Sequence, residues 1–203
     1  MARIITISRE FGSGGRELGK RLADELGFEY YDREIIEKVA EESNMDASYV
    51  ENVLNGNFSL NFPVTFGRTF FYTDALQQNV TNLLVAEHKI IKALAEKNVD
   101  MVIVGRSADI LLKNYKPLNI FVYADMESKI KRCRWRAPKN EQLTDKELAR
   151  KIKQVDAGRS RQRKIITDSD WGKKESYHLC INTTDVNIKN LIPYLAEFVK
   201  CYF

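Results

Sequence analysis

The sequence predicts an α/β protein whose parallel sheet is covered by helices on both faces. Residues 4–7 are a β-branched run, typical of a strand buried on both sides. Further apolar or aromatic runs occur at 28–31, 101–104, 119–124 and 177–184. The segments between these runs have apolar residues at helical spacing. Such alternation of strands and helices is typical of an α/β protein. A chain of 203 residues suffices for one domain with an inserted lid or for two small lobes, and we expect a single domain, residues 1–203.

The helical segments have identifiable caps. Gly27 is expected to end the first helix, because glycine readily adopts the left-handed C-cap conformation. Asp125 is expected to begin the helix from residue 126, and Thr144 with Glu147 is expected to form a capping box. The expected helices cover residues 18–26, 35–40, 46–50, 74–96, 126–136, 145–163 and 188–199.

Composition excludes several classes of protein. The three cysteines have no CxxC spacing, and with two histidines they argue against a structural zinc site. This cysteine usage favours a reduced, cytoplasmic setting. No apolar run approaches the roughly 20 residues of a membrane span, and no signal peptide is visible before the first strand.

A glycine-rich turn joins the first strand to the first helix. Three glycines fall within four residues, and Leu18 opens the apolar face of the helix. Glycines let successive N–H groups point inward, and a helix N-terminus adds partial positive charge. Strand, turn and helix together therefore predict a phosphate site. The residues expected to bind a nucleotide there are Gly12, Ser13, Gly14, Gly15, Arg16, Glu17 and Lys20.

The loop departs from the full Walker pattern, G-x-x-x-x-G-K-[ST]. Residues 8–15 (SREFGSGG) and 104–107 (VGRS) resemble the cytidylate kinase-like branch of the P-loop kinases. Cytidylate kinases carry the loop DGPSGSGKGT, and an ungapped match puts Gly15 on its catalytic lysine and Glu17 on its threonine. The resemblance implies a three-layer P-loop NTPase-type fold with a monophosphate-binding insert and an arginine-rich lid.

The missing loop lysine means that positive charge must come from another residue. Arg16 and Lys20 lie four residues apart on one helix face, so we expect one of them to supply it. Arg16 pointing outward to a surface carboxylate is the alternative for that side chain. We expect Mg²⁺ to bridge the phosphates of ATP mostly through water, because the loop threonine is missing and Val104 replaces a strand-end aspartate.

The resemblance places the phosphate acceptor beside three further residues. Asp32 and Arg33 follow the second strand, where the family carries an aspartate in a segment that meets the nucleoside monophosphate. Helix capping by Asp32 is the alternative for that residue. Arg106 follows the strand 101–104, and the family's arginine at that place reaches the acceptor phosphate.

Two segments are candidates for contacting the base. Residues 43–73 are the expected insert, in which Arg68 is the basic residue of interest. Its aromatic residues either stack on a base or form the small core of the insert; they are Phe58, Phe62, Phe66, Phe70 and Phe71. After the last strand, Asn182 and Thr183 either border the base or make the turn.

Residues 129–164 are the expected lid and carry fourteen Lys/Arg against four Asp/Glu. This charge suits a polyphosphate or a nucleic acid, and a solvated helix surface is the alternative. Guanidinium groups match phosphate oxygens bidentately, so lid arginines are expected to stabilise the transferring phosphoryl group. The candidates are Arg132, Arg136, Arg159, Arg161 and Arg163.

Together these features predict a kinase that transfers a phosphoryl group from ATP to a nucleoside monophosphate such as CMP or dCMP. The expected catalytic residues are Arg16, Arg106, Arg132, Arg159 and Arg161. The alternatives are a nucleotide- or nucleic-acid-binding protein that has kept the fold without catalysis, and a kinase for another acceptor. We expect neither a nucleic-acid nor a membrane partner, and the sequence leaves the oligomeric state open.

Overall fold

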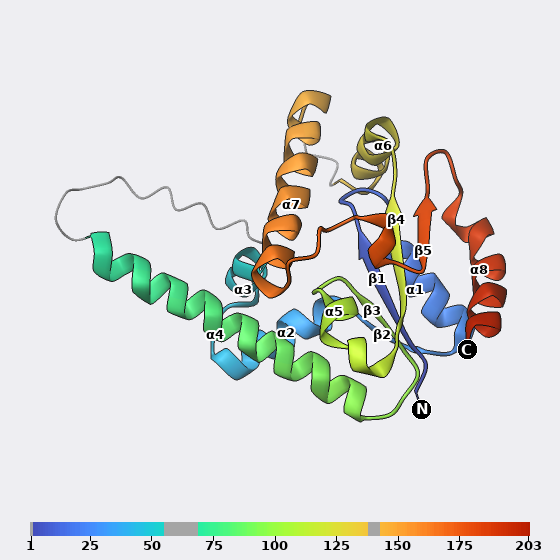
Figure 1. Ribbon diagram of the computed structural model, residues 1–203. Coiled ribbons are helices and arrows are strands. Elements are labelled where there is room, and N and C mark those ends of the chain that lie inside the picture. The colour runs from blue at the N-terminus through green and yellow to red at the C-terminus, as the bar shows by residue number, and fades with distance from the viewer. Residues whose placement is uncertain (1, 55–68, 138–142) are drawn as a thin grey trace.

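A sheet of five parallel strands runs through the centre of the protein (Figure 1). The computed structural model describes residues 2–54, 69–137 and 143–203, with side chains in α4 from residue 78 onward. The strand order is β2-β3-β1-β4-β5. The strands are β1 (Ile4–Arg9), β2 (Glu29–Tyr31), β3 (Met101–Val104), β4 (Leu118–Tyr123) and β5 (Leu179–Asn182). Every pairing is parallel, which confirms the predicted sheet.

Helices cover both faces of the sheet (Figure 1). Alternate residues of β1 show the layering: Ile4 packs in a cluster with α2 and α4, whereas Ile5 and Ile7 pack with α1 and α8. The α-helices are α1 (Gly15–Leu26), α2 (Arg33–Ser43), α3 (Ala47–Leu54), α4 (Thr69–Glu96), α5 (Ala108–Leu111), α6 (Met126–Arg136), α7 (Asp145–Ile166) and α8 (Ile188–Tyr202). Two 3₁₀ turns, η1 (Lys113–Tyr115) and η2 (Lys174–Ser176), complete the described elements.

The carboxyl ends of the central strands lie side by side. In the register of the sheet Ile7 of β1 pairs with Val104 of β3, and Arg9 pairs with Val122 of β4. The N–H of Gly105 then donates to the carbonyl of Ile7 at 2.9 Å. The chain segments that follow β1 and β3 therefore emerge together, and α6 and α7 stand above this edge (Figure 1).

The capping residues in the sequence predicted most helix ends correctly. Gly27 caps α1 with a φ of 68°, Asp125 accepts from the N–H of Ser128, and both hydrogen bonds of the Thr144–Glu147 capping box are present. The predicted helix 74–96 begins earlier, at Thr69, and the final helix extends beyond residue 199 to Tyr202. The predicted strand 177–184 is shorter, because β5 covers only Leu179–Asn182.

The expected insert at 43–73 is described only in part. Its first residues form the end of α2 and the helix α3, and Val50, Val53 and Leu54 of α3 are buried in the same cluster as α2 and α4. Arg68 and the phenylalanines expected beside it lie outside the residues whose side chains are described, so their role stays a prediction. Within the described residues, no helix has the length and apolar character needed to cross a membrane.

Candidate functional site

The loop between β1 and α1 has the backbone that its glycines predict. Gly12 and Gly14 have φ values of 79° and 84°, in the left-handed region that favours glycine. A Cβ on Gly14 would lie 2.3 Å from Cδ1 of Ile188, so close packing also requires glycine there. Gly14 precedes the first turn of α1 and no side chain caps that turn. The first N–H groups of α1 therefore face the loop, as in anion sites at helix N-termini.

Side chains from distant elements fix the shape of this loop. The hydroxyl of Ser13 donates to the carbonyl of Glu10 at 2.8 Å, and the hydroxyl of Thr183 donates to the carbonyl of Ser13 at 2.7 Å. From α7, Asp156 accepts the N–H of Phe11 at 2.7 Å. Thr183 is fully buried and Asn182 accepts from the N–H of Thr184, so these two residues form the turn and hold the loop.

A cleft of about 350 Å³ lies over the loop, and we call it the loop cleft. Its volume falls within the usual range of small-molecule sites. Glycines of the loop form one wall, and most of the charged residues that line it are basic. These are Arg9, Arg16, Arg132, Arg136, Lys151 and Arg159, against the acidic Glu10 and Glu51. An anionic ligand fits this lining.

Four arginines converge where β1 and β3 end, and we call Arg9, Arg16, Arg106 and Arg159 the arginine cluster. Asp32, at the end of β2, forms ion pairs with Arg16 and, at 3.4 Å between Nη2 and Oδ1, with Arg9. Arg159 of α7 donates to the carbonyl of Arg9 at 2.9 Å. Parts of β1, α1 and α7 thus meet at this end of the sheet, with Asp32 paired to both Arg9 and Arg16.

Arg9 and Arg159 carry positive charge in a largely buried place, whereas the Arg16 side chain is 56% exposed. Burial, followed by the neighbouring charge of Arg159, lowers the pKa of Arg9 to about 9. Burial likewise lowers the pKa of Arg159 to about 10, although Asp156 lies 3.2 Å from its Nη1 and opposes the shift. Both guanidinium groups are cationic at neutral pH, and a bound anion would relieve their mutual repulsion.

Arg106 has a partner that the sequence analysis did not assign. Its Nε lies 3.5 Å from Oε1 of Glu87, and Glu87 is fully buried in α4. Burial raises the pKa of Glu87 to about 7, although the charge of Arg106 opposes this shift. Gln162 of α7 donates to the other carboxylate oxygen at 3.4 Å. Arg106 and Ser107 both have positive φ, 58° and 50°, a conformation that non-glycine residues keep mainly where the surroundings enforce it.

Comparison with known protein families identifies the family to which this chain belongs. Residues 4–185 match the model of the Cytidylate kinase-like family. The chain belongs to the cytidylate kinase-like family. This agrees with the resemblance drawn from the loop and from Gly105–Arg106. Family and fold together indicate a kinase, a transferase that binds a nucleotide at a P-loop.

Solved structures show the same fold at low identity. An uncharacterized protein from Eubacterium ventriosum is 23% identical with a TM-score of 0.70, over 98% of each chain. A shikimate kinase from Bacteroides thetaiotaomicron is 15% identical with a TM-score of 0.59, over 98% of each chain. A shikimate kinase from Acinetobacter baumannii, in complex with shikimate, is 13% identical with a TM-score of 0.57, over 100% of this chain and 95% of its own. No curated protein shows a significant sequence match.

In this member of the cytidylate kinase-like family, Asp32 does not cap α2. It precedes the helix, but its side chain makes no capping hydrogen bond and instead pairs with Arg16 and Arg9. Arg16 therefore contacts a buried carboxylate, so the alternative of a surface partner is wrong. Arg33 is exposed, and Glu37 and Glu51 each lie 4.0 Å from its guanidinium.

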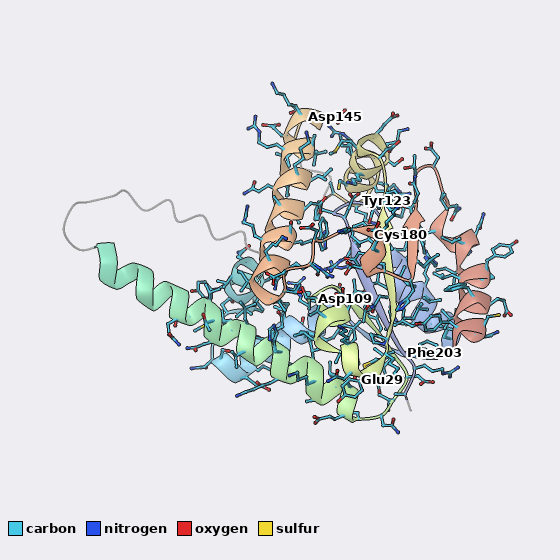
Figure 2. The ribbon with its side chains drawn as sticks, in the orientation of Figure 1. Glu29, Asp109, Tyr123, Asp145, Cys180 and Phe203 are labelled. Atoms are coloured by element: carbon cyan, nitrogen blue, oxygen red, sulfur yellow. The ribbon has the colours of Figure 1, made fainter. Side chains whose placement is uncertain are left out.

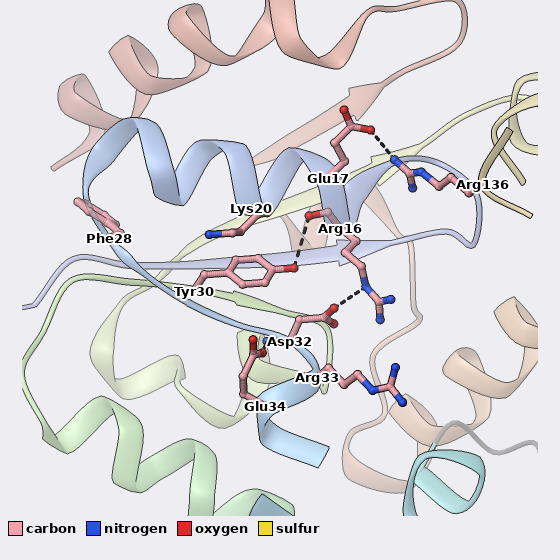
Figure 3. A pocket seen from close by; sticks show the side chains of 9 residues that line it. All are labelled: Arg16, Glu17, Lys20, Phe28, Tyr30, Asp32, Arg33, Glu34 and Arg136. Atoms are coloured by element: carbon pink, nitrogen blue, oxygen red, sulfur yellow. Dashed lines mark hydrogen bonds and ion pairs between the residues drawn. The ribbon is translucent and has the colours of Figure 1, made fainter. Parts of the chain in front are cut away.

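A second, more open cleft of about 710 Å³ lies beside α1 and the end of β2, and we call it the Asp32 cleft (Figure 3). Arg16 and Arg136 line both clefts. Lys20 lines only the Asp32 cleft, where it pairs with Asp24 at 2.7 Å. Lys20 therefore does not line the loop cleft in this structure, and its expected contact with the same phosphates as the loop stays a prediction.

Glu17, at the place of the family's threonine, contacts the lid. Its carboxylate pairs with Arg136 of α6, across the gap shown in Figure 3, and with Arg21 on its own helix. Among the described residues, no group of three or more His, Cys, Asp or Glu is placed to hold a metal ion. Glu10 is engaged as well, because Lys129 lies 2.5 Å from its carboxylate.

The lid arginines divide into different environments. Arg132 and Arg159 both line the loop cleft, and Arg132 also donates to the carbonyls of Thr183 and Val186. Arg163 is buried and pairs at 2.7 Å with Asp109 on α5, near the end of α7 opposite to Asp145 (Figure 2). Arg161 is exposed and is not among the residues that line either cleft. The structure therefore does not bring Arg161 and Arg163 to the loop cleft as expected.

Proposed function

We propose that the protein transfers the γ-phosphoryl group of ATP to a nucleoside monophosphate of the CMP or dCMP type. The arginine cluster is the observation that supports this most strongly. It gathers four guanidinium groups near the ends of β1 and β3, three of which (Arg9, Arg16 and Arg159) line the loop cleft, and it contacts fewer carboxylates than it has cations. Two phosphate-bearing substrates that meet at this point would balance the charge.

The residues divide into two binding regions in this proposal. The N–H groups of the loop, from Gly12 to Arg16, hold the β-phosphate of ATP. Asp32, Arg33, Arg68 and Arg106 bind the acceptor. Arg16 lines both clefts, so its guanidinium is placed to contact either substrate.

The transfer itself exchanges one P–O bond for another. An oxygen of the acceptor phosphate bonds to the γ-phosphorus, the bond from that phosphorus to the β,γ-bridging oxygen breaks, and ADP leaves. A monophosphate is largely ionised at neutral pH, so its oxygen needs no general base. The arginines spread the charge of the transferring group, and the lid excludes water from it.

Magnesium belongs to the proposal because phosphoryl transfer requires the phosphate charge to be neutralised, which a bound divalent cation would do. The side chains near the loop do not form a protein cage for it. Glu10 and Glu17 are paired with Lys129 and Arg136, and position 17 has no hydroxyl group. We therefore assign Mg²⁺ contacts to phosphate and water only.

Two alternatives have specific support. The absence of the loop lysine and hydroxyl favours a nucleotide-binding protein without catalysis, as does the engagement of Glu17 with the lid. The likeness to shikimate kinases favours a kinase for a different acceptor, one with a hydroxyl group. A hydroxyl acceptor calls for a base, and Asp32 is paired with two arginines, so we prefer the anionic acceptor.

The deciding experiment measures ADP release from ATP–Mg²⁺ against CMP, dCMP, UMP, AMP, GMP and shikimate. Our proposal expects turnover with CMP or dCMP well above the rate without acceptor. Turnover with shikimate alone would mean that the acceptor is shikimate and not a nucleoside monophosphate. Nucleotide binding without turnover on any acceptor would favour the non-catalytic alternative. We place the reaction in the cytoplasm, in line with three cysteines that form no disulfide.

A further inference from the structure

The side chain of Arg9 occupies the space beside Gly15, where P-loops of the Walker type carry their lysine. A Cβ added to Gly15 would lie 2.5 Å from Cβ of Arg9 and 3.0 Å from its Cγ. Contacts this short do not occur between real carbon atoms. The two Cβ atoms would collide, so in this backbone a lysine at position 15 is incompatible with any side chain at position 9, arginine included.

A second glycine accommodates the other end of the same side chain. A Cβ on Gly105 would lie 1.7 Å from Nη1 of Arg9 and 2.8 Å from its Cζ. Gly105 has a φ of 80° and follows β3 directly. The Arg9 side chain thus extends from the loop toward the end of β3, between two positions that only glycine can fill.

The guanidinium of Arg9 lines the loop cleft and carries charge that its neighbours do not balance. Its side chain is only 11% exposed. Among the described residues its ion-pair partner is Asp32, at 3.4 Å, and Asp32 also pairs with Arg16. Arg159 and Arg106 add further positive charge close by. A group in this position gains strongly from an anion.

We infer that Arg9 is the phosphate-binding cation of this loop, and that it replaces the Walker lysine from the last position of β1. In Walker loops the lysine reaches the β- and γ-phosphates of the nucleotide. The inference rests on the proposed function for its ligand, the polyphosphate of a nucleoside triphosphate. It assigns to Arg9 the role that the sequence analysis expected of Arg16 or Lys20, because the Arg16 side chain is 56% exposed and Lys20 does not line the loop cleft.

The test titrates the purified full chain with inorganic pyrophosphate by calorimetry. The variants are Arg9→Gln and Arg9→Lys, and thermal unfolding reports whether each is folded. Arg3→Gln is the matched control, because Arg3 directly precedes β1 at its opposite end and pairs there with Asp100. We expect Arg9→Gln to weaken binding by at least tenfold and Arg9→Lys to weaken it measurably, since lysine lacks the bidentate fork. Arg3→Gln should bind as the unsubstituted chain does.

Unchanged affinity in a folded Arg9→Gln variant would overturn the inference, and so would a failure of the unsubstituted chain to bind pyrophosphate. If Arg9→Gln does not fold, unchanged affinity in Arg9→Lys would overturn it instead. The binding result is independent of turnover. If Arg9 variants lose pyrophosphate but no acceptor is phosphorylated, the proposed function fails and the role of Arg9 stands.

Discussion

The carboxylate of Glu87 lies 3.5 Å from Nε of Arg106 in the interior of the protein, and so joins the middle of α4 to the end of β3. Gln162 extends this link to α7. A buried carboxylate between an arginine of the arginine cluster and α7 is placed to hold that arginine in position. Its protonation should also affect the stability of the fold.

Replacing Glu87 with glutamine should flatten the pH dependence of stability. Burial raises the pKa of Glu87 from 4.5 to about 7, so between these values the folded protein holds a proton that the unfolded chain releases. This group's contribution to the free energy of unfolding is therefore greatest below pH 4.5 and falls as pH rises to about 7. Glu87→Gln removes that fall. Urea unfolding between pH 5 and 8 measures it.

The matched control for this variant is Glu96→Gln, which changes an exposed glutamate on the same helix. Burial also raises the pKa values of Asp109 and Asp156, so a smaller slope should remain in Glu87→Gln. An identical slope in Glu87→Gln and in the unsubstituted chain would mean that Glu87 is ionised throughout this range.

Replacing Arg106 with alanine should impair turnover more than folding. The variant leaves Glu87 buried without its arginine, but Glu87 can take up a proton at pH 6 because burial already raises its pKa. The lost phosphate contact should lower kcat/KM about a hundredfold, or ~3 kcal/mol. The double variant Arg106→Ala/Glu87→Gln should regain stability at pH 8 without regaining turnover. Unchanged turnover in a folded single variant would remove Arg106 from the reaction.

The sheet, the loop and most helix ends could be predicted from the sequence, because these features follow from local patterns of residues. The arginine cluster could not. Arg9 packs against Gly15, and its guanidinium lies beside Gly105, which is distant in sequence, so its place cannot be inferred from a local pattern. The run of alternate arginines shows the same limit. Residues two apart on a helix face different directions, so Arg159 and Arg163 point inward while Arg161 is exposed.

ATP–Mg²⁺ should slow amide hydrogen exchange in the lid helices α6 and α7. Both helices contact the loop, through Lys129 on Glu10 at 2.5 Å and Asp156 on the N–H of Phe11 at 2.7 Å. A nucleotide bound to the loop should order these contacts. The end of α8, residues 196–202, serves as the internal reference, because none of these residues lines either cleft. Slower exchange with an oligonucleotide but not with ATP–Mg²⁺ would favour the nucleic-acid-binding alternative.

Arg16 and Lys20 should differ sharply when each is replaced with alanine. Arg16 lines both clefts and pairs with Asp32, so its loss removes a cation from between the two substrates. Removing one phosphate-stabilising group of this kind should lower kcat/KM about a hundredfold. Lys20 pairs with Asp24 on the exposed face of α1, and such pairs contribute only ~0.5 kcal/mol, so Lys20→Ala should change turnover less than twofold.

Recording ATP affinity and turnover separately identifies which substrate Arg16 serves. Because Arg9 remains in the loop cleft, Arg16→Ala should retain ATP affinity within a few-fold and lose turnover or acceptor affinity. A large loss of ATP affinity in Arg16→Ala would instead make Arg16 the replacement for the loop lysine. Greater damage from Lys20→Ala would place the missing charge one turn further along α1, although that residue lies outside the loop cleft in this structure. If neither substitution alters binding or turnover, Arg16 takes no part in the reaction, and Arg9 and the backbone N–H groups of the loop are the groups left to hold the nucleotide.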